Sequence, residues 1–164
     1  MPRRWASSAL SSATSRSVRQ TRPSAPSVEF WAERFGIDPA VFAGHTFWER
    51  GAGKVWAFRD GAASPMAIQG LGMTVLRTRQ EHWKPTLEAA QRFGRHATRN
   101  RIHLPRREAA RFLAGEDQEI DWDGDWGYLL GTHDLAGESE PLGVGLYVHG
   151  ELRSMVPKGR RRDL

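Results

Sequence analysis

The sequence predicts an α+β domain with a small, strongly bent β-sheet or barrel and flanking helices. Strand-like runs dominate both ends of the ordered region, residues 46–79 and 127–156. Between them lie two helical stretches, each opened by a proline and closed by a glycine. Strands on either side of a helical middle are typical of an α+β fold.

The chain is predicted to begin with a disordered Arg- and Ser-rich extension, residues 1–27, and the ordered domain is predicted to span residues 28–164. Residues 1–28 contain five arginines, no acid and no apolar periodicity. Their composition also resembles a mitochondrial transit peptide. A targeting segment, a disordered tail and a spurious extension therefore stay open.

The first ordered part is rich in aromatic residues, most of which we expect in the core. Ser27 can cap a short helix that Gly36 stops, and Asp38 can cap a second helical turn that starts at Pro39. The stretch TFWERGAGKVWAFRD reads as two strands about a Gly-Ala-Gly turn. The stretch MAIQGLGMTVLRTR reads as further extended structure.

Two amphipathic stretches form the predicted helical middle. KPTLEAAQRFG is opened by Pro85 and closed by Gly94, and PRREAARFLAG is opened by Pro105 and closed by Gly115. The short extended run RIHL separates them. Both helices carry arginines on their outer faces.

The last part of the domain is predicted to be β-structure. GYLLGTH reads as a strand, and LGVGLYVHGELRSMV reads as a hairpin that turns at His149 and Gly150. Pro157 is expected to end the final strand because proline cannot donate a ladder hydrogen bond.

Charge is divided into blocks along the chain. Between Arg77 and Arg111 there are ten basic and three acidic residues, whereas from Glu116 to Glu140 there are nine acids and no Lys or Arg. From Arg153 to the end there are five basic residues and one acid. Two faces of opposite potential would orient a polyanion as well as attract it.

Several chemistries find no support in the sequence. The absence of cysteine excludes disulfides, thiolate metal sites and cysteine nucleophiles. Asp121, Asp123 and Asp125 alternate, but the position where a calcium-binding loop needs glutamate is Thr132. The six histidines lack a zinc pair at i, i+4 spacing. We predict no catalytic residue, metal or cofactor, and no membrane partner because no run approaches about 18 apolar residues.

What remains is the basic, aromatic-interleaved stretch RTRQEHWKPTLEAAQRFGRHATRNR, together with VPKGRRR. Arginines can grip phosphates and stack on bases, and Trp83 beside Lys84 offers a stacking surface. A solvated helix face with Trp83 in the core is the alternative interpretation.

Three segments resemble, in order and spacing, the C-terminal RNA-binding region of the Sun/Fmu-type RNA (cytosine-5) methyltransferases. They are WKPTLEAAQRFG, RNRIHLPRREAARFLAGEDQEI and GDWGYLLGTHD followed by EPLGVGLYVHGELRSMVPKGRR. The resemblance covers roughly residues 52–162. It implies a fold similar to the PUA domain, named for pseudouridine synthase and archaeosine transglycosylase.

The chain departs from this family in two respects. The family's GwGK motif is Gly143-Val144-Gly145-Leu146 here, and its KN pair is Arg153-Ser154. The family's methyltransferase domain, with its cysteine nucleophiles and S-adenosylmethionine site, has no counterpart in the sequence. The resemblance therefore implies a stand-alone RNA-binding module without methyltransferase activity.

The resulting hypothesis is a cytoplasmic protein that binds structured rRNA or tRNA, in RNA modification or ribosome biogenesis, and that delivers RNA to a separate modification enzyme. One alternative is a protein-interaction or assembly module that docks a partner through its acidic loop. A small hydrolase with an unrecognised site is a third reading. The predicted RNA-binding residues are all cationic: Lys84, Arg92, Arg95, Arg99, Arg101, Arg153, Lys158, Arg160 and Arg161. In the resembled family the Pro-Lys-Gly motif closes the barrel, so the last three are expected at its rim, close to the arginines of AAQRFGRHATRNR.

Overall fold

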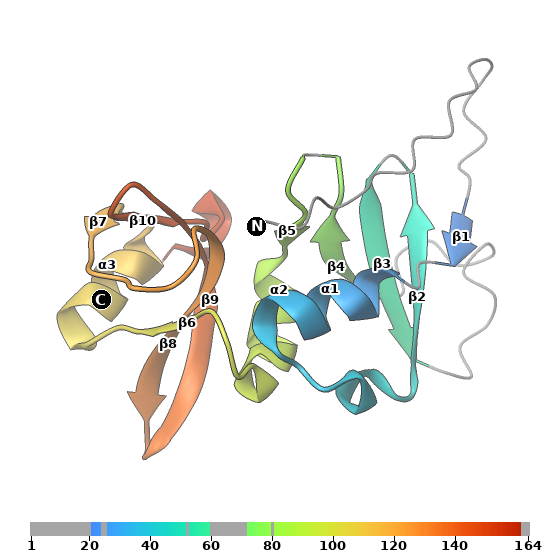
Figure 1. The fold of residues 1–164 in the computed structure, drawn as a ribbon, viewed down its shortest axis with the longest axis horizontal. Helices are drawn as coiled ribbons and strands as arrows, with labels where there is room; N and C mark the ends of the chain where they lie inside the picture. The colour runs from blue at the N-terminus through green and yellow to red at the C-terminus, as the bar shows by residue number, and fades with distance from the viewer. Residues whose placement is uncertain (1–20, 24–25, 52, 60–71, 80, 162–164) are drawn as a thin grey trace.

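The computed structural model describes residues 21–23, 26–51, 53–59, 72–79 and 81–161. In these residues three α-helices accompany two five-stranded sheets, one of them curled into a half-barrel, so the predicted α+β class with a bent sheet is confirmed. The two sheets lie at opposite ends of the long axis, and helices α1 (Pro26–Phe35) and α2 (Leu87–Phe93) lie between them (Figure 1).

The first sheet is an antiparallel meander in which neighbouring strands are consecutive in sequence. Its second and third strands pair directly around the predicted glycine turn, with Trp48 opposite Trp56. In sheet order the strands are β1 (Thr21–Pro23), β2 (His45–Arg50), β3 (Lys54–Arg59), β4 (Met73–Arg77) and β5 (Lys84–Pro85).

The second sheet has the order β6-β8-β9-β10-β7, and only the β6–β8 pair is parallel. The β9–β10 hairpin turns at His149 and Gly150, as predicted, and both residues have a positive φ, 52° and 81°. The strands are β6 (Arg101–His103), β8 (Gly127–Leu135), β9 (Glu138–Val148), β10 (Glu151–Ser154) and β7 (Gln118–Glu119).

The helix ends follow local capping chemistry. The Asp38 carboxylate accepts a hydrogen bond from the Ala40 amide at 2.8 Å and so starts the 3₁₀ turn η1 (Pro39–Phe42). Helix α3 (Arg106–Ala114) ends, as predicted, at Gly115, whose φ of 84° is in the left-handed region.

Two expected boundaries are wrong by a few residues. Helix α2 begins after Thr86, whose hydroxyl accepts from the Ala89 amide, while Pro85 belongs to β5. Strand β10 ends at Ser154 instead of at Pro157, which precedes the 3₁₀ turn η3 (Lys158–Arg160). The C-terminal end of α2 agrees with the prediction: the helix ends at Phe93 with Gly94 as its C-cap, and the 3₁₀ turn η2 (Gly94–His96) follows directly.

The predicted disordered extension falls largely outside the described residues. Two parts of the segment 1–27 are described and ordered: strand β1 pairs with β2, and Pro26 and Ser27 already belong to α1. Ser27 therefore lies inside the helix that it was expected to cap. The division of the chain at residue 28 stays a prediction.

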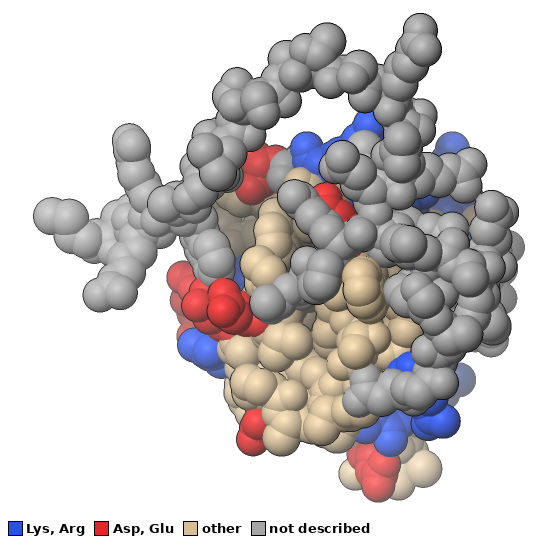
Figure 2. Space-filling view, turned by 90° about the vertical axis from the view of Figure 1, so that its right-hand side faces the viewer, with Lys and Arg blue, Asp and Glu red and all other residues tan. Residues whose placement is uncertain are grey.

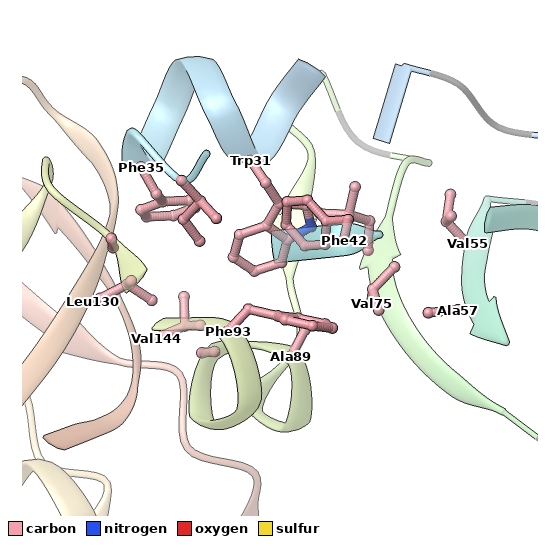
Figure 3. Close-up of a cluster of buried hydrophobic side chains, with 14 of the residues drawn as sticks. Trp31, Phe35, Phe42, Val55, Ala57, Val75, Ala89, Phe93, Leu130 and Val144 are labelled. Atoms are coloured by element: carbon pink, nitrogen blue, oxygen red, sulfur yellow. The ribbon is translucent and has the colours of Figure 1, made fainter. Parts of the chain in front are cut away.

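One hydrophobic core joins the two sheets. Trp31 and Phe35 of α1 and Phe93 of α2 meet side chains from both sides, Val75 of the first sheet and Leu130 of the second among them (Figure 3). All five side chains are almost completely buried. The second sheet is therefore held in a fixed position relative to α1 and α2.

A second core lies between α3 and the second sheet, and its centre is the fully buried Phe112. Three strand glycines leave space for this ring. A Cβ at Gly131 or Gly145 would lie 3.1 or 3.2 Å from the ring carbons of Phe112, and one at Gly143 would lie 3.5 Å away. The Gly-Val-Gly run of β9 thus serves packing.

Candidate nucleic-acid interface

The C-terminal cations form an ordered turn on the second sheet. We call residues 158–161 the basic turn. Its backbone is closed by a hydrogen bond of 2.8 Å from the Arg160 amide to the Pro157 carbonyl. Arg161 donates from Nε to the Val156 carbonyl at 3.3 Å, and its side chain lies directly over Gly115 at the end of α3. A side chain at Gly115 would collide with this guanidinium.

The basic turn is also tied to helix α2. Arg160 Nη2 lies 3.8 Å from Glu88 Oε1 in the first turn of that helix. Arg92 follows Glu88 at i+4 spacing, so the two side chains share one helix face. Within the described chain, Lys158 and Arg92 form no ion pair with a carboxylate. The basic turn therefore lies next to part of the arginine-rich segment.

Other predicted site residues have partners of their own. Arg95 pairs with Glu140 at 3.5 Å. Arg101 donates to the Ala97 carbonyl and the Ser139 hydroxyl, both at 3.0 Å. Arg99 donates to the Ala32 carbonyl of α1 at 3.0 Å. The Arg99–Ala32 and Arg101–Ser139 bonds join segments 67 and 38 residues apart in sequence, which indicates a structural contribution of both arginines.

The two remaining candidates lie elsewhere. Arg153 on β10 is paired with Glu151 at 2.8 Å, and this hydrogen bond raises the pKa of the guanidinium. Lys84 lies on β5, directly opposite Arg77 of β4. Burial, and secondarily the charge of Arg77, lower the pKa of Lys84. No hydrogen bond or ion pair of the described residues joins Lys84 to the basic turn. The nine predicted residues are distributed over several elements, from β5 to η3.

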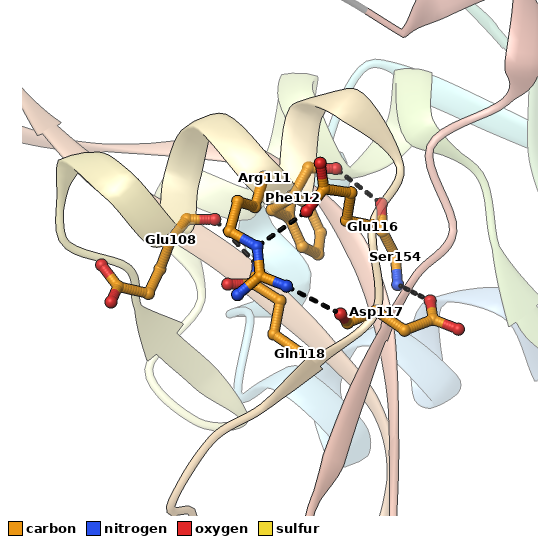
Figure 4. Close-up of polar contacts among 7 residues, drawn as sticks. All are labelled: Glu108, Arg111, Phe112, Glu116, Asp117, Gln118 and Ser154. Carbon is orange, nitrogen blue, oxygen red and sulfur yellow. Dashed lines mark hydrogen bonds and ion pairs between the residues drawn. The ribbon is translucent and has the colours of Figure 1, made fainter.

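The start of the acidic loop is occupied by internal contacts (Figure 4). Glu116 accepts from Arg111 Nε at 2.7 Å, and an Asp117 carboxylate oxygen accepts from the Ser154 amide at 3.2 Å. The Ser154 hydroxyl donates to the Phe112 carbonyl at 2.7 Å, which connects β10 with the end of α3. Ser154 replaces the second residue of the family's KN pair and has this structural role here.

Replacing Ser154 by alanine is expected to destabilise the protein by about 0.5–1.5 kcal/mol, because the buried Phe112 carbonyl would lose one of its two hydrogen-bond donors and keep only the Gly115 amide. Urea unfolding followed by circular dichroism measures this change. Arg153→Ala is the matched control, since the neighbouring side chain is exposed and should leave the unfolding midpoint nearly unchanged. Equal midpoints for wild type and Ser154→Ala would contradict the assigned role.

Two tryptophans near the predicted charged segments differ in burial. Trp83 is partly buried against the first core and lies 5.9 Å, centroid to centroid, from Phe30, which favours the core interpretation over an RNA-stacking one. Trp126 is 59% exposed and packs edge-on against His149, 4.7 Å between ring centroids. Sequence reasoning missed Trp126 because it lies inside an acidic run.

The described residues contain no group of three or more His, Asp or Glu side chains placed to hold a metal ion. Among the same residues, no helix combines the length and apolar character that a bilayer crossing requires.

Comparison with known families divides the chain. Residues 99–162 match the family model described as the methyltransferase RsmF PUA domain. This region is a PUA-like domain similar to those of the Sun/Fmu-type methyltransferases. The match covers the second sheet, α3 and η3, and it does not include residues 52–98, which the sequence resemblance had included.

A different family model accounts for the N-terminal part. Residues 9–72 match a family of unknown function, DUF7122, and this region includes α1 and strands β1 to β3. No curated protein matches the chain. The PUA-like domain thus follows a region whose family carries no functional description.

Proposed function

We propose that the protein is an RNA-binding module that uses its PUA-like domain to hold structured rRNA or tRNA. The observation that carries the proposal is the match of residues 99–162 to the PUA domain of an RNA methyltransferase family. PUA domains are non-catalytic RNA-binding domains, so a role in an RNA-modification context follows. A cytoplasmic location, a link to ribosome biogenesis, delivery to a separate modification enzyme and the lack of methyltransferase activity belong to the same proposal.

The proposed contact surface is centred on the basic turn and the adjoining face of α2. Lys158 and Arg92 carry charges without carboxylate partners in the described chain. Arg160 Nη2 lies 3.8 Å from Glu88 Oε1, and both side chains are exposed to solvent. An ammonium or guanidinium group held on a closed turn loses less conformational freedom on binding than one on a flexible tail. Phosphate groups of a folded RNA are the natural ligands for such a surface.

The double variant Lys158→Ala/Arg160→Ala is expected to weaken binding to a total tRNA or rRNA fraction by more than about 30-fold. Two charges near an anionic surface contribute about 1 kcal/mol each, which gives roughly that factor. The loss should be larger here because removing Arg160 also exposes the Glu88 charge to the RNA. Filter binding measures the dissociation constant, and thermal unfolding should be nearly unchanged.

The matched control is Arg106→Ala/Arg107→Ala, which removes the same charge at the opposite end of α3. Both arginines are exposed. An equal loss in the two double variants would mean that only net charge matters and would contradict a defined interface. Unchanged binding in Lys158→Ala/Arg160→Ala would also contradict it.

A second candidate is protein docking through the acidic loop. It is favoured by Trp126, a large exposed side chain that directly follows Asp125 and lies three residues after Asp123, both of which are also exposed. Exposed aromatic side chains are enriched at protein interfaces. This candidate takes precedence if the wild-type protein fails to bind RNA at low salt.

A further inference from the structure

The outer face of the first sheet carries two tryptophans side by side. Trp48 of β2 and Trp56 of β3 are directly opposite residues. Their neighbours along the strands, Phe47, Val55 and Ala57, point into the first core. Because side chains alternate along a strand, Trp48 and Trp56 point to the opposite face. Both are partly exposed and belong to neither core.

These two rings are not engaged by other rings of the described chain. Directly opposite residues on one face have Cβ atoms about 5 Å apart. Next to them in register is Thr74 of β4, opposite Trp56. The pair therefore offers two neighbouring indole surfaces to a ligand, with a small side chain beside them.

A row of three cations lies on the same face. Lys54 of β3 is opposite Arg77 of β4, and Arg77 is opposite Lys84 of β5. Lys54 precedes Trp56 by two residues, which places the row roughly 7 Å from the tryptophan pair along the strands. Within the described chain, none of the three cations forms an ion pair with a carboxylate.

Like charges placed directly opposite one another destabilise a sheet. At Lys84, burial lowers the pKa, and the neighbouring charge of Arg77 is the second cause. Such a row does not stabilise the isolated fold, whereas an anion bound across it would relieve the repulsion. The side of the molecule that carries the first sheet has a broad uncharged area, with Lys and Arg along parts of its border and Asp and Glu along others (Figure 2).

We propose that the outer face of the first sheet binds single-stranded nucleic acid, with Trp48 and Trp56 stacking on bases and Lys54, Arg77 and Lys84 holding backbone phosphates. Aromatic platforms beside a cationic groove are the general means of binding single strands without sequence preference. The site lies apart from the basic turn and does not rest on the function proposed above. Most of it falls in the region whose matching family has no known function.

Charge decides among possible occupants. Residues 1–20 of this chain contain four arginines and no acid, so they do not complement the cationic row. A protein partner would have to supply carboxylates for three neighbouring cations and an apolar surface for the two tryptophan rings. A single strand supplies both groups at every nucleotide, since each carries a phosphate and a base.

The test uses the full chain and a fluorescein-labelled oligouridine of about 12 nucleotides, a length within the usual site size for such surfaces. Trp48→Ala and Trp56→Ala should each weaken binding about tenfold in fluorescence anisotropy, because stacking contributes about 1–3 kcal/mol per base. Trp56→Phe should retain most of the affinity. Trp126→Ala is the matched control, being an exposed tryptophan in the loop just before β8, and should bind as wild type.

The cations provide an independent readout that does not require tryptophan removal. Lys54→Gln/Arg77→Gln should lower the log–log salt slope for oligouridine by about 1.4, since each phosphate contact in a single strand contributes about 0.7. An oligothymidine arm tells whether the site distinguishes RNA from DNA. A fully paired RNA duplex should bind all these variants as it binds wild type.

Three results would overturn the proposal. Unchanged oligouridine binding in both alanine variants is the first, and an equal loss of duplex and single-strand binding is the second. The third is a wild-type dimer in light scattering that Trp48→Ala dissociates, without any oligouridine binding, since the occupant of the face would then be a second copy. Loss of tRNA binding in Lys158→Ala/Arg160→Ala with intact oligouridine binding would support two separate surfaces.

Discussion

Replacing Phe112 by alanine is expected to lower the free energy of unfolding by about 3–5 kcal/mol. The ring is fully buried at the centre of the second core. Its neighbours Gly131, Gly143 and Gly145 have no side chains that could turn into the vacated space, so the cavity would collapse little. A loss of this size is a large fraction of the roughly 5–15 kcal/mol by which an ordinary domain is stable. Urea unfolding followed by tryptophan fluorescence measures the change.

Two companion variants make this result specific. Phe112→Leu keeps an apolar side chain and should cost clearly less than Phe112→Ala. Leu113→Ala, at the next position of α3 and only partly buried, is the matched control and should also cost less. A loss below about 1 kcal/mol in Phe112→Ala would mean that the second core is not built around this ring.

The double variant Phe112→Ala/Gly145→Ala extends the argument. In the wild type, a Cβ at Gly145 would meet Leu152 Cδ1 at 2.6 Å and the Phe112 ring at 3.2 Å. Removal of the ring relieves only the second contact. The coupling between the two positions in a double-mutant cycle therefore reports how much of the glycine requirement comes from Phe112.

The local elements could be predicted because their signals are local. Asp38 before Pro39, the glycine after α3 and the His149-Gly150 turn each fix the backbone within a few residues, and all three appear where the sequence places them. The start of α2 was missed by two residues, because Pro85 belongs to β5 and the Thr86 hydroxyl caps the helix, which begins at Leu87. The Thr86 hydroxyl also donates to the Thr74 carbonyl of β4 at 2.6 Å, a contact between separate elements.

The roles of individual arginines could not be predicted, because they depend on contacts between residues far apart in sequence. Arg99 bonds to Ala32 and Arg34 bonds to Tyr128, contacts that span 67 and 94 residues. The sequence alone does not distinguish an arginine that donates to a main-chain carbonyl of a distant segment from an arginine that is free to bind a phosphate. Burial and partner geometry separate the two kinds, and they leave the basic turn and Arg92 as the better candidates for RNA contacts.

The outer face of the first sheet was missed because its signal lies in strand register. Lys54, Arg77 and Lys84 are distant in sequence and become neighbours only through the pairing of β3, β4 and β5. The β-bulge opposite Val55 and Trp56 shifts this register by one residue. A simple alternation of strand residues would not have placed the three cations abreast.

Binding of structured RNA is expected to weaken roughly 60-fold when the salt concentration rises from about 50 to about 200 mM. The reason is counterion release, which contributes about 0.7–0.9 to the log–log slope for every phosphate that a cation neutralises. Arg92, Lys158 and Arg160, with one further cation, would give a slope of about 3. A titration of RNA binding against salt concentration measures it.

Single substitutions then assign this slope to residues. Lys158→Ala should reduce the slope by about 1. Its ammonium group has no carboxylate partner in the described chain, so it is free to neutralise an RNA phosphate. Arg107→Ala, an exposed arginine at the far end of α3, should leave the slope unchanged. Long-range attraction by net charge predicts the same reduction for both variants. A slope near zero in the wild type would contradict the proposed phosphate contacts and would favour the acidic loop as the functional surface.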